Sequence, residues 1–213
     1  MSSRAVIFVD GSNWYHALKE NGVPSLLELD YARISQKLTG PNREWLETRY
    51  YIGALKQQWN PVLYADQRRF LALISKDSPK VTTHLGRMEE RSIKNDAAVE
   101  ILAYLNDLDR RIDLEVYQSL IRLCRKHKES RVLKEKAVDV QLAVDMVRMA
   151  ERDEYDCAYL LSADGDFTPA VEGALALGKK VFAVSMNSCA QLAGIATSYI
   201  RLRKEWFSDC YRT

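Results

Sequence analysis

The amino-acid sequence predicts an α/β protein in which a mostly parallel central sheet carries helices on both faces. Short, continuous apolar runs are typical of buried strands, and they occur at 5–9, 49–55, 81–85, 157–161 and 181–185. Segments with helical periodicity separate several of these runs, at 61–76, 138–150 and 168–177. Strands that alternate with helices favour a doubly wound sheet, because each crossover helix covers one face of the sheet.

Local signals mark where several of these elements begin and end. After the first strand, Ser12 or Asn13 is placed to cap a helix that runs to about residue 20. Pro61 suits the first position of the next helix, because the missing N–H of proline costs nothing there. Gly178 follows the helix at 168–177, where glycine commonly ends a helix.

One segment, at 93–130, departs from this alternation because it is helical in character almost throughout. A break is predicted near Asp109-Arg110-Arg111, which divides the segment into two amphipathic halves. We expect a single domain over residues 1–213, with a helical insertion at about 93–130. The insertion either packs on the sheet as an ordinary helix pair or serves as a dimerisation arm or a substrate clamp.

The composition is that of a globular protein and narrows the choice of function. The chain has 213 residues, 47% of them hydrophobic, which is enough to bury a sizeable core. Its net charge of +2 is not the footprint of a strongly basic nucleic-acid binder, although it permits a polyanionic partner. The four cysteines include no CxxC pair, and Cys157 is expected to be a buried thiol. With no signal peptide and no apolar stretch of roughly 20 residues, we expect a cytoplasmic protein.

Four aspartates lie where predicted strands end or helices begin: Asp10, Asp139, Asp164 and Asp166. Parallel strands present their carboxyl ends at one edge of a sheet, and open α/β sheets bind ligands at that edge. Carboxylates gathered there repel one another unless a divalent cation holds them. Each motif alone has a second interpretation as a helix cap, because Asp, Ser and Asn are favoured at such positions. Together, the four acids predict a metal site.

Three segments carry these acids: I-F-V-D-G-S-N at 7–13, K-A-V-D-V-Q-L-A-V-D-M at 136–146 and L-L-S-A-D-G-D-F-T-P-A-V at 160–171. In this order they resemble the NYN domain of the PIN-like nuclease superfamily, and more narrowly its LabA-like group. The segments frame nearly the whole chain apart from the insertion at 93–130. The resemblance implies a three-layer PIN-like fold and RNA cleavage that depends on a divalent metal.

Carried over residue by residue, the resemblance implies that Asp10, Asp139 and Asp164 are the principal metal ligands. Asp166 would be a further acid, acting directly or through water, and Asn13 would position Asp10 or a scissile phosphate. A site made only of oxygen ligands suits Mg²⁺ or Mn²⁺ better than Zn²⁺.

Asp145 also matches the family pattern and is expected as a further ligand. Six residues place it about 120° around the helix from Asp139, so both reach one ion only if the helix begins after Asp139. A salt bridge to Arg148 or to a neighbouring element is the alternative.

RNA contacts are expected from residues around these motifs: Ser12, Trp14, Arg87, Arg91, Lys134 and Lys136. The basic side chains are suited to phosphate contacts, with a solvated surface as the alternative for each. Trp14 lies beside Asn13 and is suited to stacking on an unpaired base, with core packing as the alternative.

The function predicted from the sequence is that of a metal-dependent endoribonuclease that acts on single-stranded or looped RNA. A non-catalytic NYN protein that binds RNA or a regulatory partner is the first alternative, because a fold does not guarantee its chemistry. A phosphohydrolase of another α/β family is the second. It is less favoured because such enzymes often place a second acid two residues after an aspartyl nucleophile, and Ser12 stands there. A homodimer formed through the insertion is a possible assembly.

Overall fold

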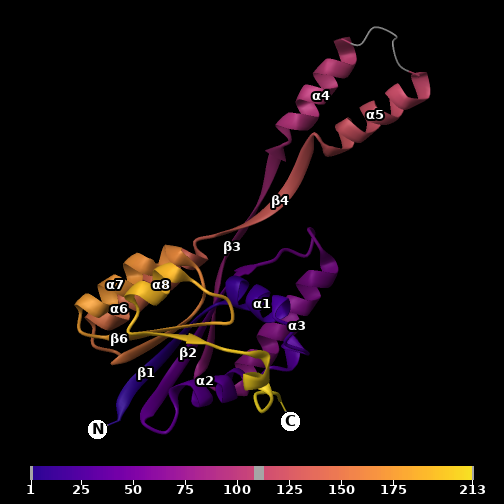
Figure 1. The fold of residues 1–213 in the computed structure, drawn as a ribbon. Helices are drawn as coiled ribbons and strands as arrows, with labels where there is room; N and C mark the ends of the chain where they lie inside the picture. Colours follow the sequence, from indigo (N-terminus) through magenta and orange to yellow (C-terminus); the bar gives the residue numbers. More distant parts are fainter. Residues whose placement is uncertain (1, 108–112, 213) are drawn as a thin grey trace. The chain divides into compact units, whose positions relative to one another are not determined.

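The computed structural model describes residues 2–107 and 113–212, and the chain divides into two compact units (Figure 1). The first unit comprises Met1–Arg87 and Lys136–Thr213, and the second comprises Met88–Glu135. All the aspartates predicted for the metal site belong to the first unit.

The strands are β1 (Ser3–Asp10), β2 (Arg43–Ala54), β3 (Val81–Lys94), β4 (Glu129–Lys136), β5 (Cys157–Leu161), β6 (Lys180–Ser185) and β7 (Ser198–Arg201). They follow the order β4-β3-β2-β1-β5-β6-β7 in one sheet. Five pairings are described residue by residue, and all five are parallel. The predicted α/β class with a mostly parallel sheet is therefore confirmed.

The helices of the first unit are α1 (Gly11–Glu20), α2 (Tyr31–Thr39), α3 (Pro61–Asp77), α6 (Val138–Glu151), α7 (Thr168–Ala176) and α8 (Ala190–Ile195). Three short 3₁₀ helices join them: η1 (Leu26–Glu28), η2 (Gly165–Phe167) and η3 (Lys204–Phe207). None of the helices in the described part of the chain has an apolar stretch long enough to cross a bilayer.

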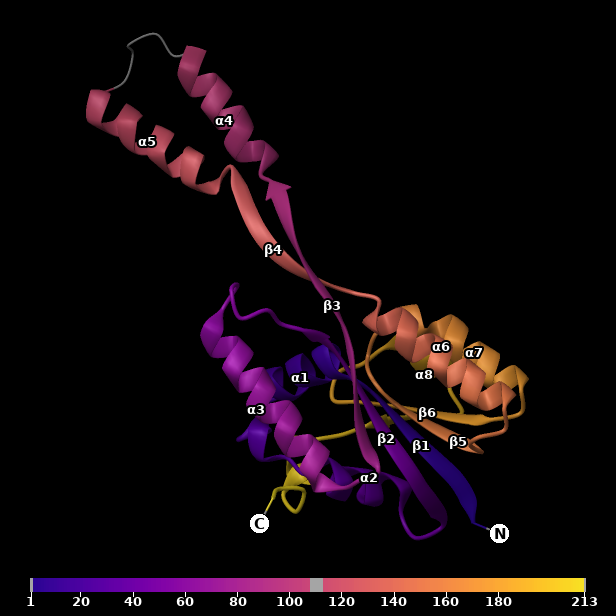
Figure 2. The same ribbon diagram turned by 180° about the vertical axis from the view of Figure 1, so that it is seen from behind.

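Two hydrophobic cores lie on opposite faces of the sheet, as the alternation of side chains along a strand requires. Ile7 and Val9 of β1 belong to the core beneath α1, α2 and α3. Val6 and Phe8 belong to the other core, beneath α6, α7 and α8. Figures 1 and 2 show the two groups of helices on either side of the strands. The unit therefore has three layers, with β1 buried on both faces.

The strand order reverses direction between β1 and β5. From β1 the chain adds β2 and β3 on one side, and it later returns to add β5, β6 and β7 on the other. At such a switch point the connections leave the carboxyl ends of neighbouring strands in opposite directions, which opens a crevice for ligands. Asp10 ends β1, and Ser162 to Asp164 follow β5, so the predicted site residues Asp10 and Asp164 lie at this switch point.

Several boundaries differ from those predicted, each for a physical reason. Asp10, rather than Ser12 or Asn13, caps α1, since its side chain accepts from the backbone N–H of Asn13. Strands β2 and β3 are longer than their apolar runs because charged and polar residues continue them. Helices α2 and α8 and strand β7 were not predicted. Helix α8 has six residues and strand β7 four, which is too short for a clear periodic signal, whereas the amphipathic pattern of the nine-residue α2 was overlooked.

The second unit contains a helical hairpin of α4 (Asp96–Asp107) and α5 (Leu114–His127), preceded by the end of β3 and followed by β4. The predicted helical character is therefore present, although the ends of the predicted segment at 93–94 and 129–130 are strand. The predicted break at Asp109-Arg110-Arg111 lies outside the described residues. Leu105, Ile121 and Cys124 form a small core of the hairpin.

Candidate functional site

Asp10 is buried at the carboxyl end of β1, where two neighbouring loops hold its carboxylate. Only 4% of the residue is exposed. The backbone N–H of Asn13 donates to its Oδ1 at 3.2 Å, and the hydroxyl of Ser162 donates to its Oδ2 at 2.9 Å. Val9 pairs with Leu161 in the parallel register, so Asp10 and Ser162 are the next residues of two strands that end together. The side chain of Asp10 is consequently fixed in place.

The same hydroxyl joins Asp10 to the loop that follows β5. Ser162 is fully buried, and its Oγ accepts from the backbone N–H of Asp164 at 3.0 Å. Asn13 makes a second bridge, since its Oδ1 accepts from the N–H of Ala163 at 2.9 Å. Sequence reasoning missed this role of Ser162. The signal that could have found it is a small hydroxyl residue in register with Asp10 on the adjacent strand.

Asp164 and Asp166 lie in the η2 loop, on the solvent side of Ser162. The Oδ1 of Asp164 caps η2 by accepting from the N–H of Asp166 at 2.9 Å. Asp164 is half-buried and Asp166 is exposed, so both carboxylates reach solvent. The sequence suggested Asp166 or Thr168 as the cap in this loop, whereas Asp164 is the residue that caps η2. The Oδ2 of Asp164 has no hydrogen bond among the described contacts.

Asp139 lies in the first turn of α6. The start of this helix is held in place because it packs closely against β3. A Cβ on Gly86 would come within 2.1 Å of a methyl group of Val138, so only glycine fits at that point of β3. Partial desolvation raises the pKa of Asp139, and the negative charges of Asp164 and Asp166 raise it further. The structure therefore gathers Asp139, Asp164 and Asp166 into one region of negative potential.

These residues suit a divalent cation by chemistry and by charge. Their donors are hard carboxylate oxygens, which Mg²⁺ and Mn²⁺ prefer. The pKa of Asp139 is raised first by partial burial and then by the charges of Asp164 and Asp166, and a cation would offset the repulsion among these three carboxylates. In the described part of the chain, no three Asp, Glu, His or Cys residues are already grouped closely enough to hold one ion. The carboxylates therefore match a divalent cation in the type of their donor atoms and in their charge, although the described residues do not contain a preformed set of three ligands.

Asp145 lies in a different network, on the side of α6 that faces β2. Its Oδ2 accepts from the hydroxyl of Tyr51 at 2.9 Å and forms a salt bridge with Arg49 at 3.2 Å. The ring of His84 stacks on Tyr51 with the centroids 4.6 Å apart. Burial and the charge of Arg49 lower the pKa of His84, which keeps this imidazole neutral near pH 7. Asp145 therefore forms a salt bridge to a neighbouring element, which was the alternative to its expected role as a metal ligand.

Trp14 requires a correction as a base-stacking residue. Its side chain is fully buried, and its ring packs against Phe207 with the centroids 6.1 Å apart. A ring without exposed surface offers no face to a nucleobase, so the prediction that it stacks on RNA is wrong. The residue lies on the inner side of the amphipathic helix α1, with Ala17 and Leu18.

Two of the four predicted basic residues have side chains that the structure describes. Arg87 is exposed and Lys136 is half-buried. A Cβ on Gly86 would lie 3.1 Å from the carbonyl oxygen of Lys136, so Arg87 and Lys136 belong to chain segments that meet just before Asp139. The side chains of Arg91 and Lys134 lie outside the described residues. Ser12 is half-buried in the first turn of α1.

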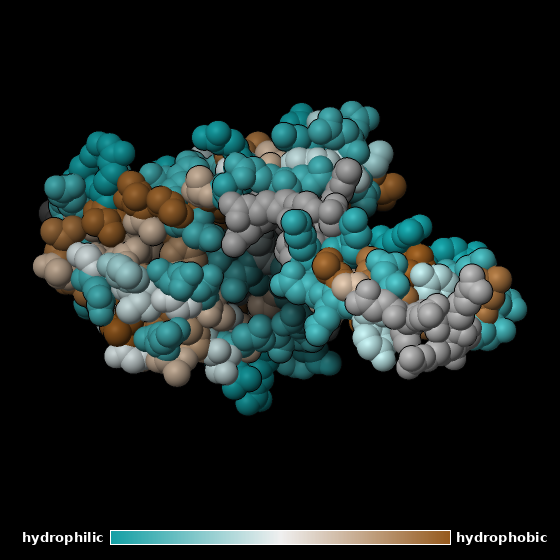
Figure 3. Space-filling model, turned by 90° about the horizontal axis from the view of Figure 1, so that it is seen from above, coloured by the Kyte–Doolittle hydropathy of each residue, from teal (hydrophilic) through white to brown (hydrophobic). Residues whose placement is uncertain are grey.

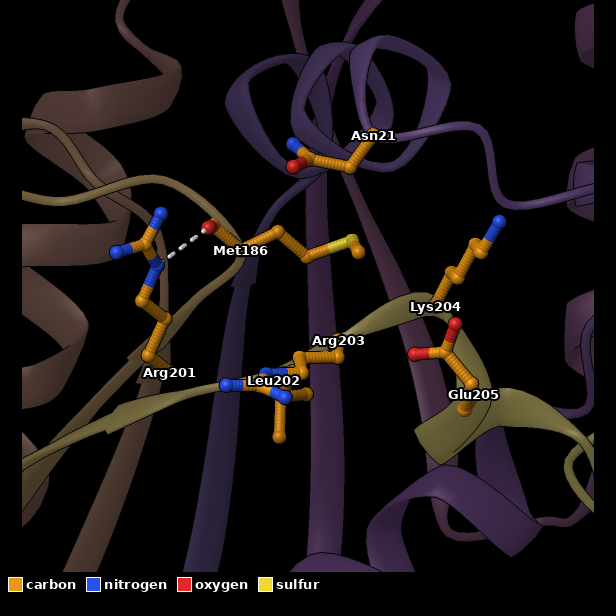
Figure 4. A pocket seen from close by; sticks show the side chains of 7 residues that line it. All are labelled: Asn21, Met186, Arg201, Leu202, Arg203, Lys204 and Glu205. Atoms are coloured by element: carbon orange, nitrogen blue, oxygen red, sulfur yellow. Dashed lines mark hydrogen bonds between the residues drawn. The ribbon is translucent and has the colours of Figure 1, made fainter.

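A basic cavity that sequence reasoning missed lies at the carboxyl ends of β6 and β7. It encloses about 500 Å³, and its lining residues are Asn21, Met186, Arg201, Leu202, Arg203, Lys204 and Glu205 (Figure 4). The Nε of Arg201 donates to the carbonyl oxygen of Met186 at 3.2 Å, which holds one guanidinium at the wall. Three cations and one anion make this cavity a candidate for phosphate contacts at the same edge of the sheet.

The three-layer fold and its acidic switch point define a class, the PIN-like nuclease fold. Comparison with protein-family models matches the NYN domain over residues 90–202. The match covers 113 of the 213 residues, which is more than half of the chain. The chain therefore belongs to the NYN domain family. Asp139, Asp164 and Asp166 lie within the matched residues, whereas Asp10 and Asn13 precede them.

Solved structures add support for the fold alone. A protein of unknown function from Vibrio parahaemolyticus is similar with a TM-score of 0.55 and 17% identity, over 99% of this chain and 96% of that one. A structure described under the mechanism and regulation of Sir2 enzymes has a TM-score of 0.40 and 10% identity, over 97% and 90% of the two chains. The second likeness is too weak to carry an argument. The search of curated proteins found no match.

Proposed function

We propose that the chain is a metal-dependent endoribonuclease of the LabA-like group of NYN proteins, acting on single-stranded or looped RNA. The observation that supports this most strongly is the link from Asp10 through Ser162 to Asp164 at the switch point of the sheet. Asp139 adds a third carboxylate whose pKa responds to the charge of Asp164. Together these residues offer acidic oxygens where an open α/β sheet binds its ligands.

Asp10, Asp139 and Asp164 would hold Mg²⁺ or Mn²⁺, with Asp166 in support. A bound ion of this kind lowers the pKa of a coordinated water and so supplies a nucleophile for phosphodiester hydrolysis. The carboxylate of Asp10 keeps a fixed orientation through its two hydrogen bonds. The Oδ1 of Asn13 already accepts a hydrogen bond from the backbone N–H of Ala163. In this proposal the Nδ2 of Asn13 therefore donates to a phosphate oxygen of the RNA. Arg87 and Lys136 provide positive charge for the RNA strand.

The proposal is tested by cleavage of labelled RNA in the presence of Mg²⁺, in the presence of EDTA and after Mg²⁺ is restored. EDTA should stop cleavage, and Asp164→Asn should abolish it. Glu172→Gln is the matched control because Glu172 is an exposed carboxylate on α7. Cleavage that survives both EDTA and Asp164→Asn would contradict the proposal.

A non-catalytic RNA-binding NYN protein is the second candidate. The observation that favours it is the lack, within the described residues, of three metal-binding side chains already grouped around one point. Specific RNA binding by the wild-type protein, without cleavage in Mg²⁺ or Mn²⁺, would support this alternative.

We also propose that the α4–α5 hairpin pairs with a second copy of the chain. Large hydrophobic side chains are exposed along both helices: Val99, Ile101, Tyr104, Leu114, Val116, Leu120 and Leu123. Figure 3 shows brown, hydrophobic residues on the surface of the hairpin. Two helices cannot cover one another on all sides, whereas a pair of hairpins can form a four-helix core. Helix α4 begins with Asp96 and α5 ends with Arg125, Lys126 and His127, so the two helices carry complementary charge at these ends.

A further inference from the structure

A second cavity, of about 660 Å³, opens beside α1, and its mainly apolar wall includes four aromatic rings, those of Tyr15, Tyr31, Tyr50 and Phe70. Its wall is built from α1, η1, the start of α2, the second half of β2 and the first half of α3. A volume of this size is typical of sites that take a small organic ligand. All its residues belong to the first unit of the chain.

Three rings form a rigid floor for this cavity. Tyr31 meets Tyr50 edge-to-face with the centroids 5.1 Å apart, and Phe70 completes the group at 5.5 Å from Tyr50. Tyr15 and Leu63 lie at the cavity and are 42% and 52% exposed, respectively. A cavity with a buried aromatic floor and exposed apolar side chains suits a flat ring that enters from solvent.

The floor of the cavity is in direct contact with the turn that carries Asp10. The hydroxyl of Tyr50 donates to the carbonyl oxygen of Gly11 at 3.4 Å, and a Cβ on Gly11 would lie 2.5 Å from the Tyr50 ring. Tyr15 is four residues further along α1, a rise of about 6 Å, which corresponds to roughly two nucleotide steps of a stacked strand. A strand that crosses the carboxylates therefore brings a neighbouring base within reach of the cavity.

The charges at the cavity favour a base with an exocyclic amino group. Glu28 and Asp66 contribute carboxylate acceptors to the wall, and such an amine is a donor. Lys19 contributes one cation, which is suited to an adjoining phosphate. Gln67 takes no part in recognition, because its amide already donates to the carbonyl of Gly53 and accepts from the N–H of Leu55.

We propose that this cavity binds one unpaired, amino-bearing base of the RNA strand, a neighbour of the phosphate held at the carboxylates. The inference rests on the proposed ribonuclease function and adds a substrate preference to it. Tyr15 stacks on the base, Leu63 covers its edge, and Glu28 and Asp66 accept from its amino group. Uracil, which has no exocyclic amine, binds more weakly at this position.

The test measures binding in Ca²⁺, a hard cation that takes oxygen ligands and can hold the phosphate at the carboxylates, by fluorescence anisotropy of labelled six-nucleotide RNAs. In an all-adenine strand, each base in turn is replaced by an abasic residue or by uracil. At one position, the abasic residue should lower the affinity of the strand for the protein about tenfold, because it removes one stack of a base on an aromatic ring. Tyr15→Ala should weaken the intact strand by about the same factor and abolish the difference at that position, whereas Tyr15→Phe should retain both.

A matched pair on α3 provides the control. Leu63→Ala should weaken binding, whereas Val62→Ala should not, because Val62 is 69% exposed and does not line the cavity. An abasic scan with no sensitive position, or equal affinity of Tyr15→Ala and wild type, would overturn the cavity assignment. Binding of free adenosine without binding of the strand would also overturn it. The ribonuclease proposal is tested separately from base binding, by the cleavage assay in Mg²⁺. Cleavage that Asp164→Asn leaves unchanged would contradict that proposal and would leave the binding result standing.

Discussion

Replacing Ser162 by alanine removes the hydroxyl that joins two of the candidate metal ligands. The Oγ of Ser162 donates to Asp10 at 2.9 Å and accepts from the N–H of Asp164 at 3.0 Å, in a fully buried position. A hydrogen bond to a charged group contributes about 1.5–3 kcal/mol, and a buried N–H without a partner costs about 1–3 kcal/mol. We therefore expect Ser162→Ala to lower the free energy of unfolding by about 3 kcal/mol.

The assay is urea unfolding, in which the midpoint should fall while the slope of free energy against urea stays the same. A double-mutant cycle then tests the partner. In an Asp10→Asn background, Ser162→Ala should cost about 1 kcal/mol less, because the acceptor no longer carries a charge. RNA cleavage by Ser162→Ala should also fall, since Asp10 and Asp164 lose their common hydrogen-bond partner.

Ser35 provides a matched control for this prediction. It is also fully buried, and its hydroxyl forms hydrogen bonds with the backbone carbonyl of Tyr31 within α2 and with the hydroxyl of Thr48 on β2 rather than with a carboxylate. Ser35→Ala should lower stability without coupling to Asp10→Asn and without loss of cleavage. A loss below about 0.5 kcal/mol for Ser162→Ala, or strict additivity with Asp10→Asn, would refute the reasoning.

Three further changes follow from the geometry. Because Arg4 lowers the pKa of Asp156, its ion pair stabilises the fold above the carboxyl pKa of the unfolded chain and is lost as pH falls through the lowered value. Asp156→Asn should therefore lower stability by up to about 1 kcal/mol at pH 7, and this loss should shrink as the pH falls through the lowered pKa of Asp156, as measured by unfolding at a series of pH values. Gly86→Ala should cost about 1–3 kcal/mol in urea unfolding, since its Cβ would meet Val138; an unchanged midpoint would contradict the packing. Leu123→Glu should convert a dimer to a monomer in light scattering, and an unchanged mass would exclude the hairpin interface.

Much of the fold could be predicted because its strands are buried on both faces. The strand Cys157–Leu161 has the predicted bounds, since every one of its residues is buried and apolar. The strand ends then place Asp10 and Asp164 at one edge of the sheet without any knowledge of tertiary contacts. Prediction of β2 was less complete, because its first half (R-E-W-L-E-T) mixes charged and polar residues with apolar ones without a regular alternation.

The site could be predicted only as far as local sequence determines it. Nothing near Ser162 in the chain reveals that it will face Asp10, because that contact depends on the register of β1 and β5. Trp14 illustrates the opposite error, since nearness in sequence to Asn13 did not indicate which side of α1 it occupies. For Asp145, helical geometry correctly indicated a different direction from Asp139, but its partners Arg49 and Tyr51 come from a distant strand.

The most direct test of the central claim is the rate of RNA cleavage by wild-type protein and Asp164→Asn, each measured in Mg²⁺ and in EDTA. The account predicts cleavage by the wild type in Mg²⁺ alone, with a loss of about 100-fold or more in Asp164→Asn and none in Glu172→Gln. Equal cleavage by wild type and Asp164→Asn, or cleavage that persists in EDTA, would contradict a metal site built on these carboxylates.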